Sequence, residues 1–214
     1  MKNVWIVFII TLVLASCSGL NSGYSPAVEK LIQEAESGSA DSQYSMAIHL
    51  TNGSGVEQNY TKAADWLNLA SAQDHHPAQY LLAIAYNTGR GIAPDQKEAV
   101  LLFTKAANSG HARAQYQLGE AYANARGVEK DIKVASTWYE KAARQKHPEA
   151  LFSLGVMRAT GIDESKDLEE AWVWLQLAAE NGHALAAQIR DQVETKLASS
   201  SLIKAKKAAK DWQW

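Results

Sequence analysis

Four histidines are the first residues in this chain whose type and spacing suggest chemistry. They are His75, His111, His147 and His183, and each is 36 residues from the next. One metal ion needs its imidazole nitrogens within about 2.1 Å of itself, whereas equivalent positions of successive units lie on neighbouring helices about 8–10 Å apart. The spacing therefore argues against a metal site. We predict instead that each ring follows the end of a helix and contacts its free carbonyls.

A second candidate is Ser201, which forms a Ser-x-x-Lys motif with Lys204. In serine enzymes that use this motif, Ser-Asp-Asn and Lys-Thr-Gly motifs follow it, and neither occurs here. The adjacent carboxylates of Asp163 and Glu164 are interpreted as solvated charge in a loop. The sequence thus predicts no catalytic residue, no metal and no cofactor.

The histidines belong to a longer pattern that keeps the same period. The positions that repeat with it include Ala63, Ala99, Ala135 and Ala171, and also Ala70, Ala106, Ala142 and Ala178. A fixed period in this range is typical of a stacked helical-repeat array, in which each unit packs on its neighbours. Such a stack presents an extended surface, so we expect it to bind a partner rather than to enclose a reaction.

The third unit shows how one period is built. Ala114, Leu118 and Tyr122 are spaced by four residues and share one face of a first helix, called helix A. Gly127 in the next loop suits a backbone with positive φ, as do the aligned Gly55 and Gly91. A second helix, helix B, then begins after an N-cap residue whose side chain accepts a backbone hydrogen bond. The predicted N-caps are Asn59, Asp95, Asp131 and Asp167.

Taken together, Ala-x-x-x-Leu-Gly-x-x-Tyr, Gly-x-Gly-Val and Asp-x-x-x-Ala-x-x-Trp-Tyr-x-x-Ala-Ala resemble Sel1-like repeats, which are related to tetratricopeptide repeats. Four copies cover residues 40–183. The resemblance implies an all-α fold, a right-handed α-solenoid of four 36-residue helix-turn-helix repeats with helical end caps. We expect an N-terminal cap helix over 26–39 and C-terminal capping helices over 184–214, with Ser199 or Ser200 as a further N-cap. The fourth copy departs, because Arg158 replaces the closing tyrosine and Asp163 replaces the second loop glycine.

Helix A carries an aromatic residue in every copy, and this gives the candidate partner-binding residues. They are Tyr44, Tyr80, Tyr116 and Phe152, with the amides Asn52, Asn87 and Asn124 on the same helices. By analogy with tetratricopeptide arrays, helix A lines the concave surface, where such rings suit an extended peptide. Core packing between units explains a periodic aromatic equally well. Both interpretations stay open.

The N-terminal sequence predicts where in the cell the protein is located. Residues 1–16 are predicted to be a signal peptide, since their apolar run is too short to span a bilayer. Leu14-Ala15-Ser16-Cys17 resembles the lipobox of bacterial lipoproteins, in which the cysteine, here the only one in the chain, is lipidated. Residues 17–25 then form the lipidated cysteine and a flexible tether. In such lipoproteins, a residue other than Asp after the cysteine, here Ser18, favours the outer membrane, facing the periplasm.

The charge balance limits the partners. The chain has 21 Lys and Arg against 23 Asp and Glu, with a net charge of −2, so no large basic field favours nucleic acid. We therefore expect a lipid-anchored scaffold or adaptor of the cell envelope that binds a protein in the periplasm or membrane through the concave face. A glycan ligand stays open. The alternatives are an envelope enzyme of peptidoglycan or β-lactam chemistry and an accessory lipoprotein of polysaccharide export.

Overall fold

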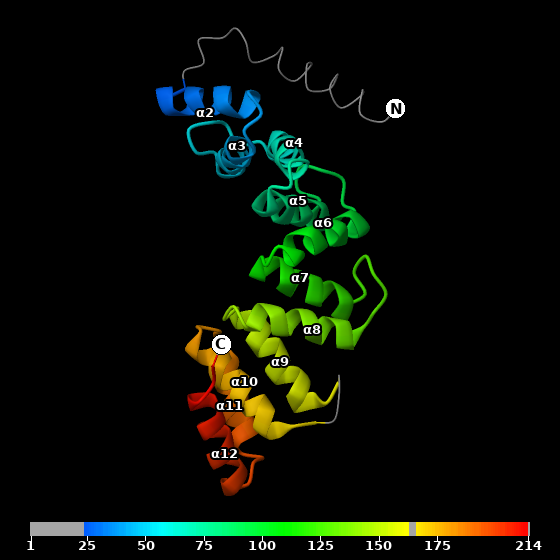
Figure 1. Cartoon of the computed structure of the whole chain (residues 1–214), viewed down its shortest axis with the longest axis vertical. Coiled ribbons are helices and arrows are strands. Elements are labelled where there is room, and N and C mark those ends of the chain that lie inside the picture. The colour runs from blue at the N-terminus through cyan, green and yellow to red at the C-terminus, as the bar shows by residue number, and fades with distance from the viewer. Residues whose placement is uncertain (1–23, 163–165, 214) are drawn as a thin grey trace. The chain divides into compact units, whose positions relative to one another are not determined.

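The computed structural model describes residues 24–162 and 166–213, and those residues contain helices but no strand (Figure 1). The described helices are α2 (Pro26–Glu36), α3 (Ala40–Asn52), α4 (Tyr60–Ser71), α5 (His76–Thr88), α6 (Gln96–Asn108), α7 (Ala112–Ala123), α8 (Ile132–Ala143), α9 (Pro148–Thr160), α10 (Leu168–Glu180), α11 (Ala186–Glu194) and α12 (Ser199–Lys210). Helices α3, α5, α7 and α9 are the four A helices, and α4, α6, α8 and α10 are the four B helices. The predicted all-α array of four 36-residue repeats is confirmed.

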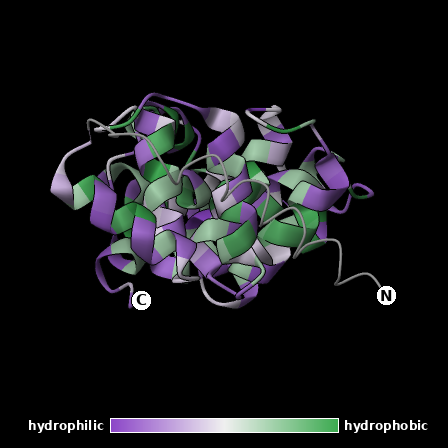
Figure 2. Cartoon of the chain, turned by 90° about the horizontal axis from the view of Figure 1, so that it is seen from above, coloured by the Kyte–Doolittle hydropathy of each residue, from purple (hydrophilic) through white to green (hydrophobic). Residues whose placement is uncertain are grey.

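The chain divides into two compact units. The first comprises the residues up to Ala78 together with Arg90–Ile92, and the second comprises Gln79–Gly89 and the residues from Ala93 onward. Within the first unit, α3 packs against α2 and α4. Within the second, α7 packs against α6 and α8, and α10 packs against α9, α11 and α12. Viewed from above, most helices carry both hydrophobic and hydrophilic stretches, as expected for helices with one buried side (Figure 2).

The predicted N-cap residue directly precedes the first residue of every B helix. The Asp131 carboxylate accepts a hydrogen bond of 2.9 Å from the backbone N–H of Val134. Asn59, Asp95 and Asp167 cap α4, α6 and α10 in the same way. The helix starts are therefore fixed locally, because each cap pairs a backbone donor that would otherwise lack a partner.

The backbone conformation of the loops requires glycine at two positions. Gly127 has φ of +74°, and a Cβ there would overlap the backbone carbonyl of Gln96 at the start of α6. Gly91 has φ of +78° and lies in the same way against the carbonyl of Tyr60. Both the positive φ and the close approach exclude a side chain at these positions. The departure at Asp163 lies outside the described residues.

Two helices, α11 and α12, follow the last repeat and pack on α10. The inner side of α12 faces the protein, since Leu202, Ala205, Ala209 and Trp212 belong to or pack against the core of the second unit. The predicted cap at Ser199 or Ser200 is wrong. The helix begins at Ser199, so Ala198 is at the cap position and no side chain caps α12. Because three serines follow one another, the sequence does not show which residue begins the helix. We attribute the observed start to the packing of the inner side of α12.

In the described part of the chain, none of the helices has the length and hydrophobicity needed to cross a bilayer. The predicted signal peptide and Cys17 lie outside the described residues.

Candidate partner-binding face

In every repeat, the aromatic ring of helix A packs against the ring of the histidine that ends the same repeat; the two rings are tilted in the first repeat and stacked in the other three. The ring centroids are 4.9 Å apart for Tyr44 and His75, 4.5 Å for Tyr80 and His111, 5.0 Å for Tyr116 and His147, and 4.0 Å for Phe152 and His183. All eight residues are partly exposed, although the His75 and His147 side chains are only 14% and 13% exposed. These ring contacts of the aromatic ladder therefore lie within the repeats, and part of each aromatic residue remains accessible to solvent.

His75 and His111 join two helices rather than completing one, whereas the His147 ring makes no capping hydrogen bond. The backbone N–H of His111 donates to the carbonyl of Ala106 in α6, while its ring nitrogen Nδ1 accepts a hydrogen bond of 3.2 Å from the N–H of Ala114 in α7. His75 makes the equivalent ring contact with Ala78 at 3.1 Å. The prediction that the ring contacts the free carbonyls of helix B is thus wrong. One helix follows the other with almost no loop, so the backbone N–H satisfies the first helix and the ring caps the second.

The two central histidines are held in the neutral form. Burial lowers the pKa of His111, and the nearby positive charge of Arg113 lowers it further. Burial also lowers the pKa of His147; the carboxylate of Glu149 opposes this shift, and Arg113 reinforces it. A neutral ring is what the capping bond of His111 requires, because Nδ1 can accept a hydrogen bond only when unprotonated. The described residues contain no group of three or more His, Cys, Asp or Glu side chains suited to a metal ion.

The third repeat contains a polar network that the sequence analysis did not identify. The hydroxyl of Tyr139 on α8 donates to Glu120 Oε1 on α7 at 2.6 Å. Arg126 pairs with Glu120 Oε2 at 3.2 Å, and the Asn124 amide donates to the same oxygen at 3.2 Å. Both oxygens of this carboxylate are therefore occupied by neighbouring side chains.

The two tyrosines near Glu120 are hydrogen-bond donors rather than bases. Burial, together with the charges of Glu120 and Glu149, raises the pKa of Tyr116 to about 12. Burial and the hydrogen bond to Glu120 raise the pKa of Tyr139. Both hydroxyls stay protonated at neutral pH, so they can donate to an acceptor but do not supply a phenolate.

A signal for this network exists in the alignment of the repeats. The position of Glu120 is occupied elsewhere by Ile48, Ile84 and Val156, and that of Tyr139 by Leu67, Phe103 and Leu175. Two aligned positions thus become polar in the same repeat. Gly119 makes room for the change, because a Cβ there would lie 2.6 Å from Cε1 of the Tyr139 ring.

The predicted amides do not lie beside the rings. Asn52, Asn87 and Asn124 follow the aromatic residue of their helix by seven or eight residues, which corresponds to about 10–12 Å along the helix. Asn124 is the C-cap of α7 and donates to Glu120. The charged neighbour of the rings is instead Arg113, which precedes Tyr116 by three residues and is exposed. Its charge acts on Tyr80 and on both central histidines.

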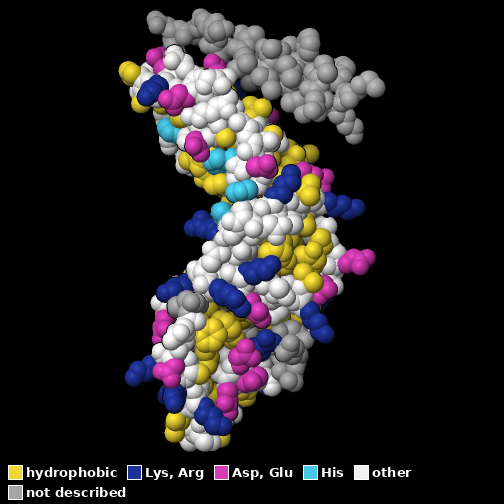
Figure 3. All heavy atoms as spheres, in the orientation of Figure 1, with side chains coloured by type: hydrophobic (Ala, Val, Ile, Leu, Met, Phe, Trp, Pro, Cys, Tyr) yellow, Lys and Arg dark blue, Asp and Glu magenta, His cyan; other side chains and the backbone are white. Residues whose placement is uncertain are grey.

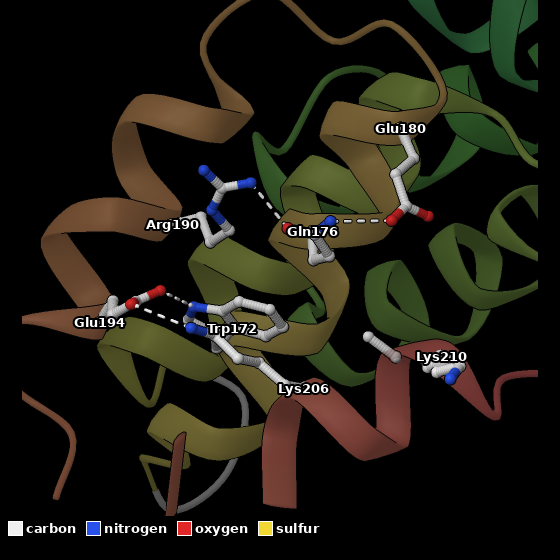
Figure 4. Close-up of a pocket in the computed structure, with 8 residues that line it drawn as sticks. Trp172, Gln176, Glu180, Arg190, Glu194, Lys206 and Lys210 are labelled. Carbon is white, nitrogen blue, oxygen red and sulfur yellow. Dashed lines mark hydrogen bonds and ion pairs between the residues drawn. The ribbon is translucent and has the colours of Figure 1, made fainter. Parts of the chain in front are cut away.

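A separate hollow of about 460 Å³ lies between α10, α11 and α12 (Figure 4). The Trp172 indole donates to Glu194 at 2.9 Å, and Lys206 pairs with the same carboxylate at 3.3 Å. Arg190 donates to Gln176 at 2.6 Å. These polar groups bond mainly to one another, so they hold the three helices together.

The paired A and B helices define a helical-repeat protein. Four consecutive segments, residues 40–75, 76–111, 112–147 and 148–183, match the Sel1 repeat model. The chain belongs to the Sel1 repeat family. Proteins with this repeat are generally protein-interaction scaffolds and generally not enzymes.

Solved structures resemble the chain closely enough to show the fold. A Sel1 repeat protein from Oxalobacter formigenes is similar with a TM-score of 0.70 and 28% identity, covering 75% of this chain and 64% of that one. The protein c5321, a protective antigen of uropathogenic Escherichia coli strains with an SLR fold, is similar with a TM-score of 0.57 and 27% identity, covering 84% and 46%. The chain thus spans less than two thirds of either protein. Helicobacter pylori cysteine rich protein B shares the fold with a TM-score of 0.50 and 20% identity, covering 64% and 98%. No curated protein matches the chain.

Proposed function

We propose that this protein is a membrane-anchored scaffold or adaptor of the bacterial cell envelope that binds a partner protein through the concave face formed by its A helices. The observation that carries this proposal is the half-buried aromatic ring that packs against a histidine ring in each of the four repeats. The stack fixes the orientation of each ring before a partner arrives. Rigid, partly exposed aromatic rings contribute strongly to protein interfaces, since little side-chain freedom is lost on binding.

The surroundings of Tyr116 indicate the chemistry of the partner. Arg113 is exposed and has no hydrogen-bond or ion-pair partner among the described residues. The Glu120 carboxylate, by contrast, is held by Tyr139 and Arg126. An extended segment with apolar side chains for the rings and a carboxylate for Arg113 complements this face.

The membrane anchor and the location are part of the proposal. Their support is the sequence signal over residues 1–16 followed by Cys17. Acyl chains on this cysteine would hold the repeats close to the outer membrane, on the periplasmic side, because the tether over residues 17–25 is short.

The test is affinity capture from detergent-solubilised envelope with the lipidated protein as bait. Arg113→Glu should abolish capture of a defined partner, because it reverses the charge beside the rings. The matched control is Lys133→Glu, which makes the same charge change at an exposed site on α8 and should leave capture intact. Both variants should melt like the wild type, since both side chains are exposed.

A second pair of variants separates the rings from their hydroxyls. Tyr80→Phe/Tyr116→Phe keeps the stacks, as Phe152 does naturally, and should weaken capture only in part. Tyr80→Ala/Tyr116→Ala removes the ring contacts and should abolish capture while helicity is retained. Undiminished capture by the alanine variant and by Arg113→Glu would show that this face is not the binding site.

The enzyme alternative predicts a different result. It requires a nucleophile, and Ser201 is the candidate from the sequence; its side chain is half-buried in the first turn of α12. Under our proposal, Ser201→Ala leaves partner capture unchanged. A measurable activity on peptidoglycan or a β-lactam that this variant lost would favour the enzyme.

A further inference from the structure

Helix α12 has an outer side that the packing of the C-terminal helices leaves exposed. Between Ser199 and Lys210 the helix contains four lysines and no acidic residue. We call the exposed side the basic face of α12. It is made by Ile203, Lys204 and Lys207, with Lys206 and Lys210 at its edge, where these two exposed lysines also line the hollow between α10, α11 and α12. Dark blue side chains are visible at the lower end of Figure 3, over the helix labelled α12 in Figure 1.

Most of the charge on the basic face is unmatched. In the described part of the chain, Lys204, Lys207 and Lys210 have no hydrogen-bond or ion-pair partner. Lys206 pairs with Glu194 at 3.3 Å, and its side chain is still 53% exposed. The nearest acid in sequence is Asp211, the C-cap of the helix. This concentration of positive charge contrasts with the net charge of −2 of the whole chain.

An exposed apolar side chain lies among these lysines. Ile203 is 69% exposed, more than the other exposed large hydrophobic residues of the described chain. Residues three, four and seven positions further along a helix lie on the same side, and for Ile203 these are Lys206, Lys207 and Lys210. The face therefore combines one protruding apolar group with a surround of flexible cations.

We propose that the basic face of α12 docks on the surface of an anionic phospholipid membrane. Its charges are spread along about two turns and do not converge on one point, which suits a surface of many mobile negative headgroups. Ile203 enters the interface between headgroups and acyl chains, and the lysine stems lie along it with their ammonium groups at the phosphates. The proposal does not depend on the ring-lined face or its partner.

An acidic protein is the other kind of anionic partner, and the face suits it less well. Recognition of single carboxylates favours arginine, whose planar group binds two oxygens at once. The positively charged residues of α12 are all lysines, which act as point charges.

The experiment measures how fast the lysines of the full-length protein react with an acetylating reagent. The protein is incorporated into vesicles of phosphatidylcholine alone or of phosphatidylcholine with one third phosphatidylglycerol, and each lysine is followed by mass spectrometry. Lys97 and Lys133 are the internal controls, since both are exposed on other helices. Any tether to the membrane acts in both vesicles, so the difference between them reports only the anionic lipid.

The proposal predicts that the α12 lysines react at least about fivefold more slowly on the anionic vesicles, because one lysine at such a surface contributes about 1 kcal/mol. The controls should not change, and the protection should disappear at about 0.5 M salt. Lys204→Glu/Lys207→Glu should remove the protection of Lys206 and Lys210, whereas Lys97→Glu/Lys133→Glu should leave it intact.

Equal reactivity of the α12 lysines on both vesicles would overturn the proposal. So would protection by soluble polyglutamate without protection by anionic vesicles, since this would identify an acidic protein as the partner. Ile203→Ser tests the apolar contribution, and it should reduce the protection without changing the melting temperature.

Discussion

The third and fourth repeats both place a charged side chain between helices, and they satisfy it in different ways. In the third, Glu120 is bound within the repeat, by Tyr139 at 2.6 Å and Arg126 at 3.2 Å. In the fourth, Arg158 pairs with Glu170 of its own repeat at 2.9 Å and reaches Glu140 of the third repeat at 3.9 Å. The first arrangement stabilises one repeat, whereas the second also links two.

This difference shows that the repeat tolerates a charged side chain between its helices when a neighbouring side chain pairs with it. The aligned repeats have aliphatic residues at the position of Glu120, and Leu50, Tyr86 and Tyr122 at the position of Arg158. Glu170 has the more demanding role, because it also accepts a hydrogen bond of 3.0 Å from the Trp174 indole. The packing of Trp174 against Trp212, with ring centroids 4.7 Å apart, extends this cluster to the end of the chain.

The largest effect is therefore expected for Glu170→Ala. It removes the carboxylate that pairs at 2.9 Å with the Arg158 guanidinium, which is 11% exposed, and it removes the acceptor of Trp174. Breaking a buried pair from one side costs about 3–5 kcal/mol. We expect about 2–3 kcal/mol here, because the Glu170 side chain is 41% exposed. Urea denaturation measures the free energy of unfolding.

Arg158→Tyr is the matched control for that variant, since it restores the residue of the second and third repeats. It removes the buried charge itself, and the two glutamates left behind can be hydrated. We expect a loss of less than about 1 kcal/mol. A loss as large as that of Glu170→Ala would show that the ion pair itself, rather than the stranded charge, stabilises the fourth repeat.

The next effect comes from converting the third repeat toward the second. Glu120→Ile leaves the Tyr139 hydroxyl buried and unpaired, with an expected cost of about 1–3 kcal/mol. Tyr139→Phe removes one bond from Glu120 and should cost about 1 kcal/mol. The double variant reproduces the Ile84–Phe103 pair of the second repeat, and it should be more stable than the sum of the single effects predicts. Additive effects in this double-mutant cycle would show that the two residues do not act as a pair.

Where the two repeats agree, their variants should agree as well. Asp131 and Asp167 each accept one bond of 2.9 Å from a backbone N–H of their B helix. Asp131→Ala and Asp167→Ala should each cost about 1 kcal/mol, measured by the same denaturation. A much larger loss at one site would mean that the aspartate has a role beyond capping.

The smallest effect is a dependence of stability on pH that involves His111 and His147, which lie at either end of the third repeat. Their pKa values are lowered in the folded state, so the unfolded chain binds more protons between the folded pKa and the ordinary value of about 6.5. Stability should therefore be fully present above about pH 6.5 and should fall as the pH drops through the folded pKa. His111→Asn provides a cap that does not titrate, and His147→Asn removes the second titrating ring, so the double variant should flatten this dependence between about pH 7 and 5. An unchanged slope would assign the dependence to other groups.

The periodic features of the fold were predictable from the sequence, and the departures from the period were not. The N-caps at Asn59 and Asp131 and the loop at Gly127 follow from local rules that act within a few residues. Glu120 and Arg158 are visible in the sequence as departures from the repeat pattern. Their partners, however, lie on other helices, and the spacing of residues within a repeat does not predict contacts between helices. The roles of His75 and His111 were assigned to the wrong helix end, since the sequence does not show that their rings cap the helix that follows. The ladder of rings was identified, but its stacking on the histidines required the structure.

The central claim is that the partner binds the A helices, and site-specific photo-crosslinking in cells tests it most directly. A photoreactive amino acid at Arg113 on α7 is compared with the same group at Thr137, an exposed site on α8. Our account predicts a defined crosslinked product from position 113 and none from position 137. A product from position 137 alone, or the absence of any product from position 113, would contradict it.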